Sequence, residues 1–344
     1  MTGTTHQALF LPEKFAEFKV GDKETPKPGS GQLLLKVEAS ALNPVDWKIQ
    51  KYGFFIEEFP AILGFDVAGV VDQVGEGVTK FAKGDRVLYH AGHAGGFQQY
   101  SLANAETTAK IPVKLSFEDA ASLPSAVAAA GVGLYAAKPL GAGFVAPLEP
   151  SARGKYAGNP LVVLGGASSL GQSIVQFAKL SGFSPIIVTA SLKNEAYLKS
   201  LGVTHVIDRY IPLSSLPAEI AKVTSAPVET VFDTVSSSET QQAGYDLVAD
   251  GGHLLVYLPK QFKPTDGKNI ESTSVHGTWV VPETHPLGIA INAKLTELLE
   301  ERALKPNRVE VLPGGLNAVA GGLERLRANQ VSGGKLVVHP QETS

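Results

Sequence analysis

Short apolar runs alternate with helical stretches after about residue 126, and this alternation is the feature that most constrains the fold. Such a pattern is typical of consecutive βαβ units, which predict an open parallel sheet in an α/β domain. The predicted strands are Leu161–Leu164, Ile186–Thr189, His205–Asp208, Thr230–Asp233 and Leu254–Leu258, and the predicted helices between them include Gln172–Leu180 and Asn194–Leu201.

A glycine turn joins the first predicted strand to the helix that follows it. From residue 165 to residue 171 the chain reads GGASSLG. Between a strand and a helix, such a turn indicates a dinucleotide site in a Rossmann-type, doubly wound sheet, because N–H groups at the helix start bind the pyrophosphate. Ser168 replaces the middle glycine of the usual motif, and we expect its N–H and hydroxyl to face the phosphates. The predicted cofactor-binding residues here are Gly165, Gly166, Ser168, Ser169, Leu170 and Gly171.

The residues after the second and third predicted strands indicate which dinucleotide binds. NAD-binding folds usually carry an acidic residue about 20 residues beyond the turn, where it binds the ribose 2′-hydroxyl. Here that region holds Ser191 and Lys193 without an acid, and Arg209 and Tyr210 follow the third strand. Cations and a hydroxyl fit a 2′-phosphate, so we predict NADP(H) as the cofactor. The predicted set gains Ser191, Lys193, Tyr210 and, at the end of the fifth strand, Leu258.

A purely structural role is the alternative for two of these residues. Ser191 would then cap the next helix, and Lys193 would be a solvated residue of its first turn.

Residues 1–125 follow a different pattern. Apolar residues alternate along Leu33–Val37 and Val67–Val71, and turns that contain glycine separate such runs. Glycines inside the segment Gly64–Val71 indicate bulges, sharp bends or close backbone approach. We therefore predict a small β-barrel in this part of the chain.

Composition excludes several classes of site. The chain has 30 Lys and Arg against 33 Asp and Glu, for a net charge of −3, so it lacks the positive excess that nucleic acid or an anionic membrane would attract. It has no cysteine, which rules out disulfides, cysteine-ligated zinc and thiol nucleophiles. Residues 1–10 show no targeting pattern, and the apolar run Ala126–Ala137 is too short to span a bilayer. We expect a cytoplasmic protein with Ala126–Ala137 as a buried helix.

Taken together, these motifs resemble the medium-chain dehydrogenase/reductase superfamily over essentially the whole chain. Within it, four features look most like the zinc-free fungal enoyl reductases, which include trans-acting partners of polyketide synthases and are close to quinone oxidoreductases. These features are Asn43–Lys48, the glycine turn, the insertion Pro139–Asn159, and the end of the chain with Leu312–Gly315 and Gly333–Val338.

The resemblance implies the domain organisation. A GroES-like β-barrel catalytic domain would comprise residues 1–125 and 281–344, and a Rossmann-type NADP(H)-binding domain residues 126–280. The tail would contain the helices Leu287–Ala303 and Leu316–Asn329 and the strands Arg308–Leu312 and Lys335–His339.

The resemblance also implies chemistry without a metal. Where zinc-bearing members hold catalytic zinc, this chain has Asn43 and Phe65, which are not zinc ligands. We expect no metal from His90 and His93 either, since no third ligand accompanies them at a suitable spacing. Hydride addition to an enone spreads charge into an enolate and is easier without a metal than ketone reduction.

We therefore expect an NADPH-dependent reductase of activated C=C bonds that acts on a small-molecule substrate, and the resemblance makes a polyketide synthase a candidate partner. Lys48 is the preferred polar residue for the carbonyl oxygen, and Asn43 and Asp46 shape the nicotinamide side. The structural alternative is an exposed Asp46–Lys48 ion pair. Many members of the resembled family carry a threonine near the nicotinamide where this chain has Ala129. The resemblance therefore implies that one hydrogen bond of the family is absent here.

Two other functions stay open. The same residues would suit an NADPH quinone oxidoreductase, or a non-catalytic protein that binds NADPH or docks on a synthase.

The insertion Pro139–Asn159 is either a lid on the substrate side or a surface excursion. A strand is expected at Ser274–Val280, and the chain could be a monomer or a homodimer.

Overall fold

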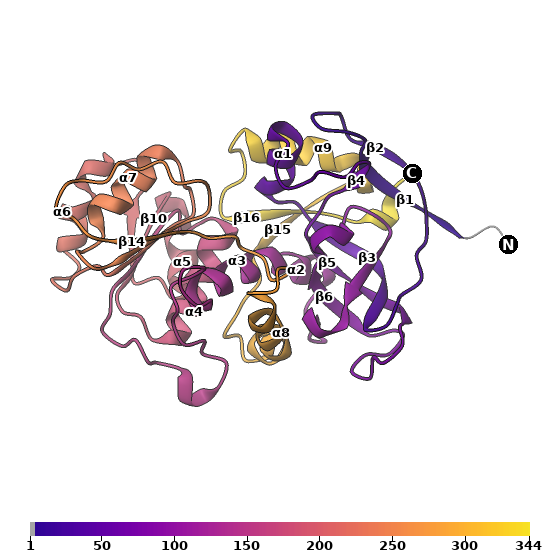
Figure 1. The fold of residues 1–344 in the computed structure, drawn as a ribbon, viewed down its shortest axis with the longest axis horizontal. Coiled ribbons are helices and arrows are strands. Elements are labelled where there is room, and N and C mark those ends of the chain that lie inside the picture. The colour runs from indigo at the N-terminus through magenta and orange to yellow at the C-terminus, as the bar shows by residue number, and fades with distance from the viewer. Residues whose placement is uncertain (1–3) are drawn as a thin grey trace. The chain divides into compact units, whose positions relative to one another are not determined.

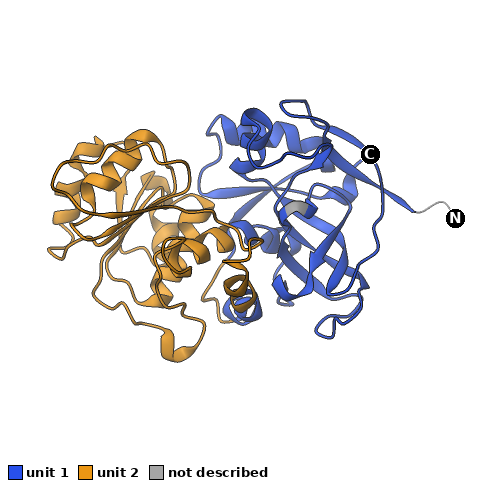
Figure 2. Cartoon of the chain, viewed as in Figure 1, with its two compact units in different colours: residues 1–125, 292–300, 306–344 blue, residues 126–291, 301–305 orange. Residues whose placement is uncertain are grey.

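The structure is a computed structural model that describes residues 4–344, apart from the side chain of His93. It divides into two compact units (Figure 2). Unit 1 contains the described residues up to Ser125, together with Asn292–Glu300 and Pro306–Ser344. Unit 2 contains Ala126–Ile291 and Glu301–Lys305.

Unit 2 is built on a six-stranded sheet in the order β11-β10-β9-β12-β13-β14, in which every pair is parallel. Its order is that of a doubly wound, Rossmann-type sheet. Figure 1 shows α4 and α5 on one side of the sheet and α6 and α7 on the other. The strands are β9 (Leu161–Leu164), β10 (Ile186–Ala190), β11 (His205–Asp208), β12 (Thr230–Asp233), β13 (His253–Val256) and β14 (Glu271–Ser274).

The helices of unit 2 are amphipathic or fully buried. Four of them, α4 (Ser169–Ser181), α5 (Glu195–Leu201), α6 (Leu216–Ala221) and α7 (Ser238–Leu247), connect the strands. Residues 126–135 of α3 (Pro124–Tyr135) are almost all buried, which confirms the expected buried helix. Central strands such as β9 and β12 are buried at every residue, because helices cover both faces.

Unit 1 contains the predicted barrel-like β structure. A seven-stranded sheet runs β15-β16-β3-β5-β6-β8, with β7 also paired to β3, and a three-stranded sheet runs β2-β1-β4. The strands are β1 (Thr5–Leu11), β2 (Lys19–Glu24), β3 (Gln32–Ala41), β4 (Ala61–Ile62), β5 (Asp66–Val74), β6 (Arg86–His90), β7 (Tyr100–Asn104), β8 (Thr108–Lys110), β15 (Arg308–Leu312) and β16 (Gly334–Val338).

The glycine in β5 has the role expected of it. A Cβ on Gly69 would lie 2.2 Å from the carbonyl oxygen of Lys36 on β3, so only glycine allows this pairing. The register of β3 against β5 shifts twice along the pair, as bulges in a bent sheet require. The helices of unit 1 are α1 (Pro44–Tyr52), α2 (Phe117–Ala121) and α9 (Val319–Arg327), together with the last part of α8 (His285–Glu300).

Three expectations from the sequence need correction. The strand expected at Ser274–Val280 is wrong, since β14 ends at Ser274; its partner β13 ends at Val256 and offers no edge beyond it. Residues 281–291 group with unit 2, where Ile291 packs against Gly131 of α3. The expected helix Leu316–Asn329 is a 3₁₀ turn at Gly315–Ala318 followed by α9.

The insertion Pro139–Asn159 is held at both ends. The N–H of Phe144 donates to Leu134 at the end of α3, and the N–H of Tyr156 donates to Ser181 at the end of α4. The rings of Phe144 and Tyr156 pack on Phe183, with centroids 5.0 and 4.9 Å away. The insertion therefore precedes β9 at the opposite end of that strand from the glycine turn, which favours a surface excursion over a lid.

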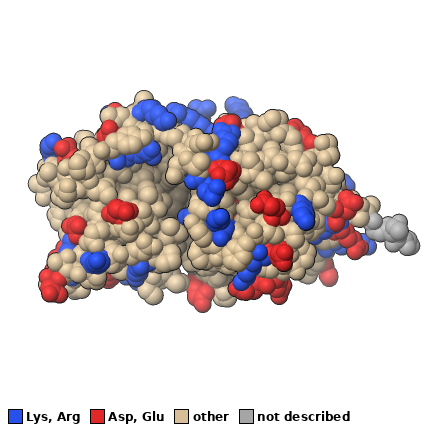
Figure 3. Space-filling model, turned by 90° about the horizontal axis from the view of Figure 1, so that it is seen from above, with Lys and Arg blue, Asp and Glu red and all other residues tan. Residues whose placement is uncertain are grey.

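Charges of both signs are interspersed on the face seen in Figure 3. Within the described part of the chain, no helix is long and apolar enough to span a bilayer.

Candidate functional site

The glycine turn of unit 2 is held by threonines from both neighbouring strands. The N–H of Gly165 donates to Thr189 Oγ1 (3.0 Å) and the N–H of Gly166 to the Thr189 carbonyl (3.0 Å) at the end of β10. The Thr234 hydroxyl, just after β12, donates to the Gly165 carbonyl (3.0 Å). The turn therefore lies at the carboxyl edge of the sheet in a fixed shape.

Two glycines of the turn allow close packing. A Cβ on Gly166 would lie 2.5 Å from the Val188 side chain, and a Cβ on Gly171 would lie 2.5 Å from the Gly165 carbonyl oxygen. Both approaches bring the start of α4 against the sheet, which is how a turn that cradles a pyrophosphate is built.

Ser168 shapes the turn from within. Its hydroxyl accepts from the N–H of Gly171 (2.9 Å), and its own N–H donates to the Gly165 carbonyl (3.0 Å). The N–H is therefore engaged within the turn, which corrects the expectation that it faces an anion. The hydroxyl of the exposed Ser168 side chain also lies 2.9 Å from Thr234 Oγ1, and its approach to a phosphate stays a prediction. Ser169 begins α4, and the N–H of Leu170 in the same first turn has no acceptor among the described residues. Leu170 can therefore offer this N–H to a phosphate.

The carboxyl ends of β10 and β11 bring the next predicted residues together. Ala190 pairs with Asp208, so Ser191 and Lys193 lie beside Arg209 and Tyr210. The Arg209 guanidinium donates to the Tyr210 hydroxyl (2.8 Å). That bond lowers the pKa of the exposed Tyr210 side chain, and a bond to Ser191 and the charge of Lys193 contribute.

The two basic side chains of this group are available to a ligand. Lys193 and Arg209 are exposed, and neither makes an ion pair within the described part of the chain. Ser191 precedes a 3₁₀ turn but makes no capping bond with its side chain, so the alternative in which it serves as a cap is wrong. The acid at the end of β11, Asp208, accepts from the N–H of Tyr210 (3.2 Å).

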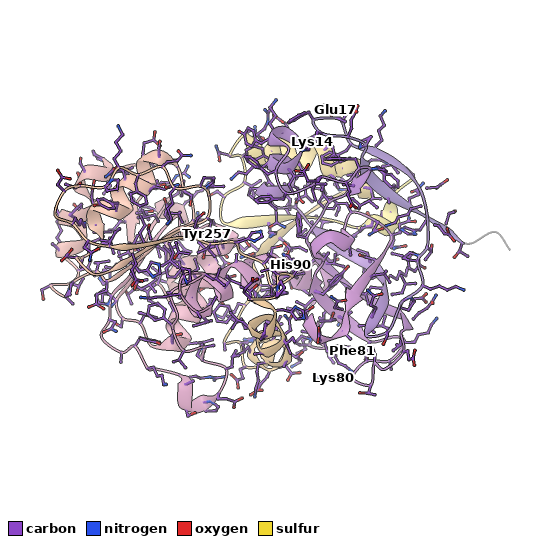
Figure 4. The ribbon with its side chains drawn as sticks, in the orientation of Figure 1. Lys14, Glu17, Lys80, Phe81, His90 and Tyr257 are labelled. Carbon is purple, nitrogen blue, oxygen red and sulfur yellow. The ribbon has the colours of Figure 1, made fainter. Side chains whose placement is uncertain are left out.

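Leu258 lies two residues beyond β13 on the same edge of the sheet. Its carbonyl accepts from the Ser274 hydroxyl (3.0 Å), which ties it to the end of β14. The neighbouring residue Tyr257, labelled in Figure 4, donates to the carbonyl of Ala129 in α3 (3.2 Å). The Tyr257 hydroxyl therefore lies beside Ala129, whose own side chain has no hydroxyl.

Unit 1 contains a buried polar cluster around the start of α1. Lys335 Nζ on β16 lies 2.7 Å from Asn43 Oδ1 and 2.7 Å from Asp66 Oδ2, and Asn43 Nδ2 donates to the same Asp66 oxygen (2.8 Å). Asp66 is 0% exposed and Lys335 4% exposed, so water does not screen the pair. The other Asp66 oxygen accepts from the N–H of Ser125.

Burial and ion pairing shift the pKa of Asp66 in opposite directions. Burial alone would raise the pKa of Asp66, but the Lys335 ammonium and the donors around the carboxylate hold it below its usual range. His90, labelled in Figure 4, pairs with Asp66 in the β5–β6 register, and burial lowers its pKa to about 4.

Asp46 adjoins this cluster from the first turn of α1. It accepts from the N–H groups of Asn43 (2.8 Å) and Gly64 (3.1 Å). Burial raises its pKa to about 7, in spite of these two bonds. Asp46 is 0% exposed, so the alternative of an exposed ion pair with Lys48 is wrong.

Lys48 lies outside the cluster. Two residues further along α1, it faces another direction than Asp46. Its ammonium lies 5.6 Å from the centroid of the Trp47 ring, burial lowers its pKa, and it has no anionic partner among the described residues. The structure thus brings Asn43 and Asp46 together and leaves Lys48 apart.

Asp66, Lys335 and Tyr257 were not predicted as site residues. Asp66 and Lys335 lie in motifs that the sequence displays, yet no spacing rule connects residues 66 and 335. Among the described side chains, which leave out His93, no group of three His, Asp or Glu is placed to hold a metal ion.

Known proteins match both parts of the chain. Residues 29–113 match the alcohol dehydrogenase GroES-like domain, and residues 169–282 match the zinc-binding dehydrogenase family. The trans-enoyl reductase himH of Aspergillus japonicus is 34% identical over 352 residues, covering 98% of each chain.

Solved structures share the fold. The CurK enoyl reductase has a TM-score of 0.78 at 22% identity, with 97% of this chain and 99% of that chain covered. The quinone oxidoreductase of Coxiella burnetii has a TM-score of 0.70 at 25% identity, with 98% and 99% covered. With a trans-enoyl reductase matched along nearly its whole length, the chain belongs to the medium-chain dehydrogenase/reductase superfamily of oxidoreductases.

Proposed function

We propose that the protein is an NADPH-dependent, metal-independent reductase that transfers hydride to the activated C=C bond of an enone or enoyl substrate. The observation that carries this proposal is the group Ser191, Lys193, Arg209 and Tyr210 beyond the glycine turn. The likeness to a trans-enoyl reductase over the whole chain supports the substrate class.

The residues of unit 2 fit an NADP(H) molecule. Leu170 and the close-packed glycines would hold the pyrophosphate, and Lys193 and Arg209 would bind the 2′-phosphate through charge-assisted bonds. Leu258 would lie toward the nicotinamide end of the sheet edge. When bound, NADPH supplies a hydride to the β-carbon and leaves as NADP⁺.

Unit 1 contributes the polar groups that the substrate would need. As hydride adds, the π electrons of the C=C bond move toward the carbonyl oxygen, and an enolate forms. Lys48, which has no anionic partner among the described residues, and Asn43, which lies apart from it, are the two alternative donors proposed to stabilise that charge. Water then supplies the proton that the α-carbon takes up. Asp46 would hold the turn that carries Asn43.

A synthase is the proposed macromolecular partner. The relative himH is named a trans-enoyl reductase, and an enzyme that acts in trans would receive its enoyl group from a separate carrier.

The test is a fluorescence titration of the purified protein with NADPH and NADH, followed by assays with an enone, an enoyl thioester and a quinone. Tighter NADPH binding with oxidation by the enone or enoyl thioester supports the proposal. Turnover with the quinone alone would favour a quinone oxidoreductase, the activity named for the Coxiella neighbour. Binding without any turnover would favour a non-catalytic NADPH-binding protein.

A further inference from the structure

The Asn43 side chain has a fixed orientation. Its Oδ1 receives the Lys335 ammonium at 2.7 Å, and its Nδ2 donates to the Asp66 carboxylate at 2.8 Å. A flipped amide would present its NH₂ to the ammonium and its oxygen to the carboxylate, and both contacts would be repulsive. The two charges therefore decide which way the amide points.

The same contacts decide what Asn43 can do. Lys335 orients the acceptor oxygen toward itself, so toward a reacting atom beside Nδ2 Asn43 acts as a donor. Nδ2 has two N–H bonds, and among the described residues only one of them has an acceptor. An ammonium on the amide oxygen draws electron density from the nitrogen and strengthens the remaining N–H as a donor.

We propose that Lys335 is a positioning residue that fixes and polarises Asn43, so that the second N–H on Asn43 Nδ2 donates to the carbonyl oxygen of the substrate. Asp66 completes the arrangement by neutralising the buried ammonium. The inference rests on the proposed function, because it assigns the donor that meets the charge developing on that oxygen.

The geometry distinguishes this role from packing alone. Lys335 is 4% exposed and Asp66 0% exposed, so their field on the amide is little screened by water. One N–H of the ammonium bonds to Asn43 and another to Asp66, so its positive charge acts on these two groups. The N–H on Asn43 would then be pre-oriented, as in an oxyanion hole, before any substrate arrives.

The kinetic experiment is a double-mutant cycle on kcat with an enone. Asn43→Ala removes the donor and should lower kcat about 100-fold. Lys335→Met combined with Asp66→Asn removes both charges, leaves no lone buried charge, and should lower kcat about tenfold, as loss of an orienting partner does. In the Asn43→Ala background the same pair of changes should have no further effect on kcat.

Controls separate a positioning role from damage to the fold. Lys335→Arg keeps the charge and should restore most of kcat relative to the Met variant. Lys83→Met, which removes an exposed lysine paired with Asp72, should leave kcat unchanged. Effects that multiply in the cycle, or a kcat within about twofold of the parent in the charge-free variant, overturn the inference.

A second readout does not depend on turnover. The Asn43 side-chain amide is followed by ¹⁵N NMR, assigned by its loss in Asn43→Ala, while cyclohexanone is added as an unreactive carbonyl probe. One Nδ2 proton should shift in the parent protein and stay unchanged in the charge-free variant. A shift without enone reduction would overturn the proposed function and support the donor, whereas reduction without any shift would overturn the donor.

Discussion

In unit 1, Asn43, Asp66 and Lys335 are buried and bond to one another, whereas in unit 2, Lys193 and Arg209 are exposed and make no ion pair within the described chain. The charges of the first group are paired with each other before any ligand arrives, so they hold the amide of Asn43 in place. The second group is open to solvent, so its positive side chains can bind an anion. Burial thus separates charges that orient another residue from charges that can bind a ligand directly.

The largest expected effect on stability comes from removing one partner of the buried Asp66–Lys335 pair. Lys335→Met leaves Asp66 as an unpaired buried carboxylate and should lower the free energy of unfolding by about 3–5 kcal/mol. Chemical denaturation measures the change. Lys222→Met, at an exposed pair with Glu219, should change it by less than about 1 kcal/mol. Equal losses in the two variants would remove the distinction between buried and exposed charge.

The raised pKa of Asp46 makes a pH-dependent contribution to stability. Its carboxyl titrates near 4 when unfolded and at about 7 when folded, so between these values the folded state binds more protons. Stability from this group is therefore present at low pH and falls as pH rises, with a slope approaching about 1.4 kcal/mol per pH unit.

The measurement compares the parent protein with Asp46→Asn by denaturation at several pH values between 4 and 8. The difference between the two should decline across that window and level off above it. A difference independent of pH would mean that burial does not raise the pKa of Asp46.

The exposed group is tested through the cofactor. Changing Lys193 and Arg209 to Ala together should weaken NADPH binding about 10- to 100-fold, because charge-assisted bonds contribute about 1.5–3 kcal/mol each in favourable cases and less when exposed. Binding of NADH should change little, and unfolding should be unaffected. Parallel losses for NADPH and NADH would show that these cations do not read a 2′-phosphate.

The glycine turn should respond through sterics alone. Gly166→Ala would place a Cβ 2.5 Å from Val188 and should cost about 1–3 kcal/mol of unfolding free energy, as overpacking does. Adding Val188→Ala removes the two γ-carbons 2.8 Å away but keeps the Cβ 2.5 Å away, so it should recover only part of the loss. Thermal unfolding of the two variants checks this, and full recovery would mean that the γ-carbons alone cause the strain.

Parts of the candidate site could be read from the sequence, and the reason differs by residue. Ser191, Lys193, Arg209 and Tyr210 were predicted together because the carboxyl ends of neighbouring parallel strands meet at one edge of a sheet. Ser168 was predicted at the right turn, but its hydroxyl oxygen caps α4 and its N–H bonds to the Gly165 carbonyl, which no local motif indicates.

Local sequence patterns were enough to predict the strands β9 to β13 to within two residues at either end, the glycine turn and the βαβ order, since these depend on periodicity within short stretches. The contacts of Lys335 with Asn43 and Asp66, the burial of Asp46 and the separate position of Lys48 came from the tertiary structure alone. Contacts between residues hundreds of positions apart depend on how the sheets close, and no local pattern records that closure.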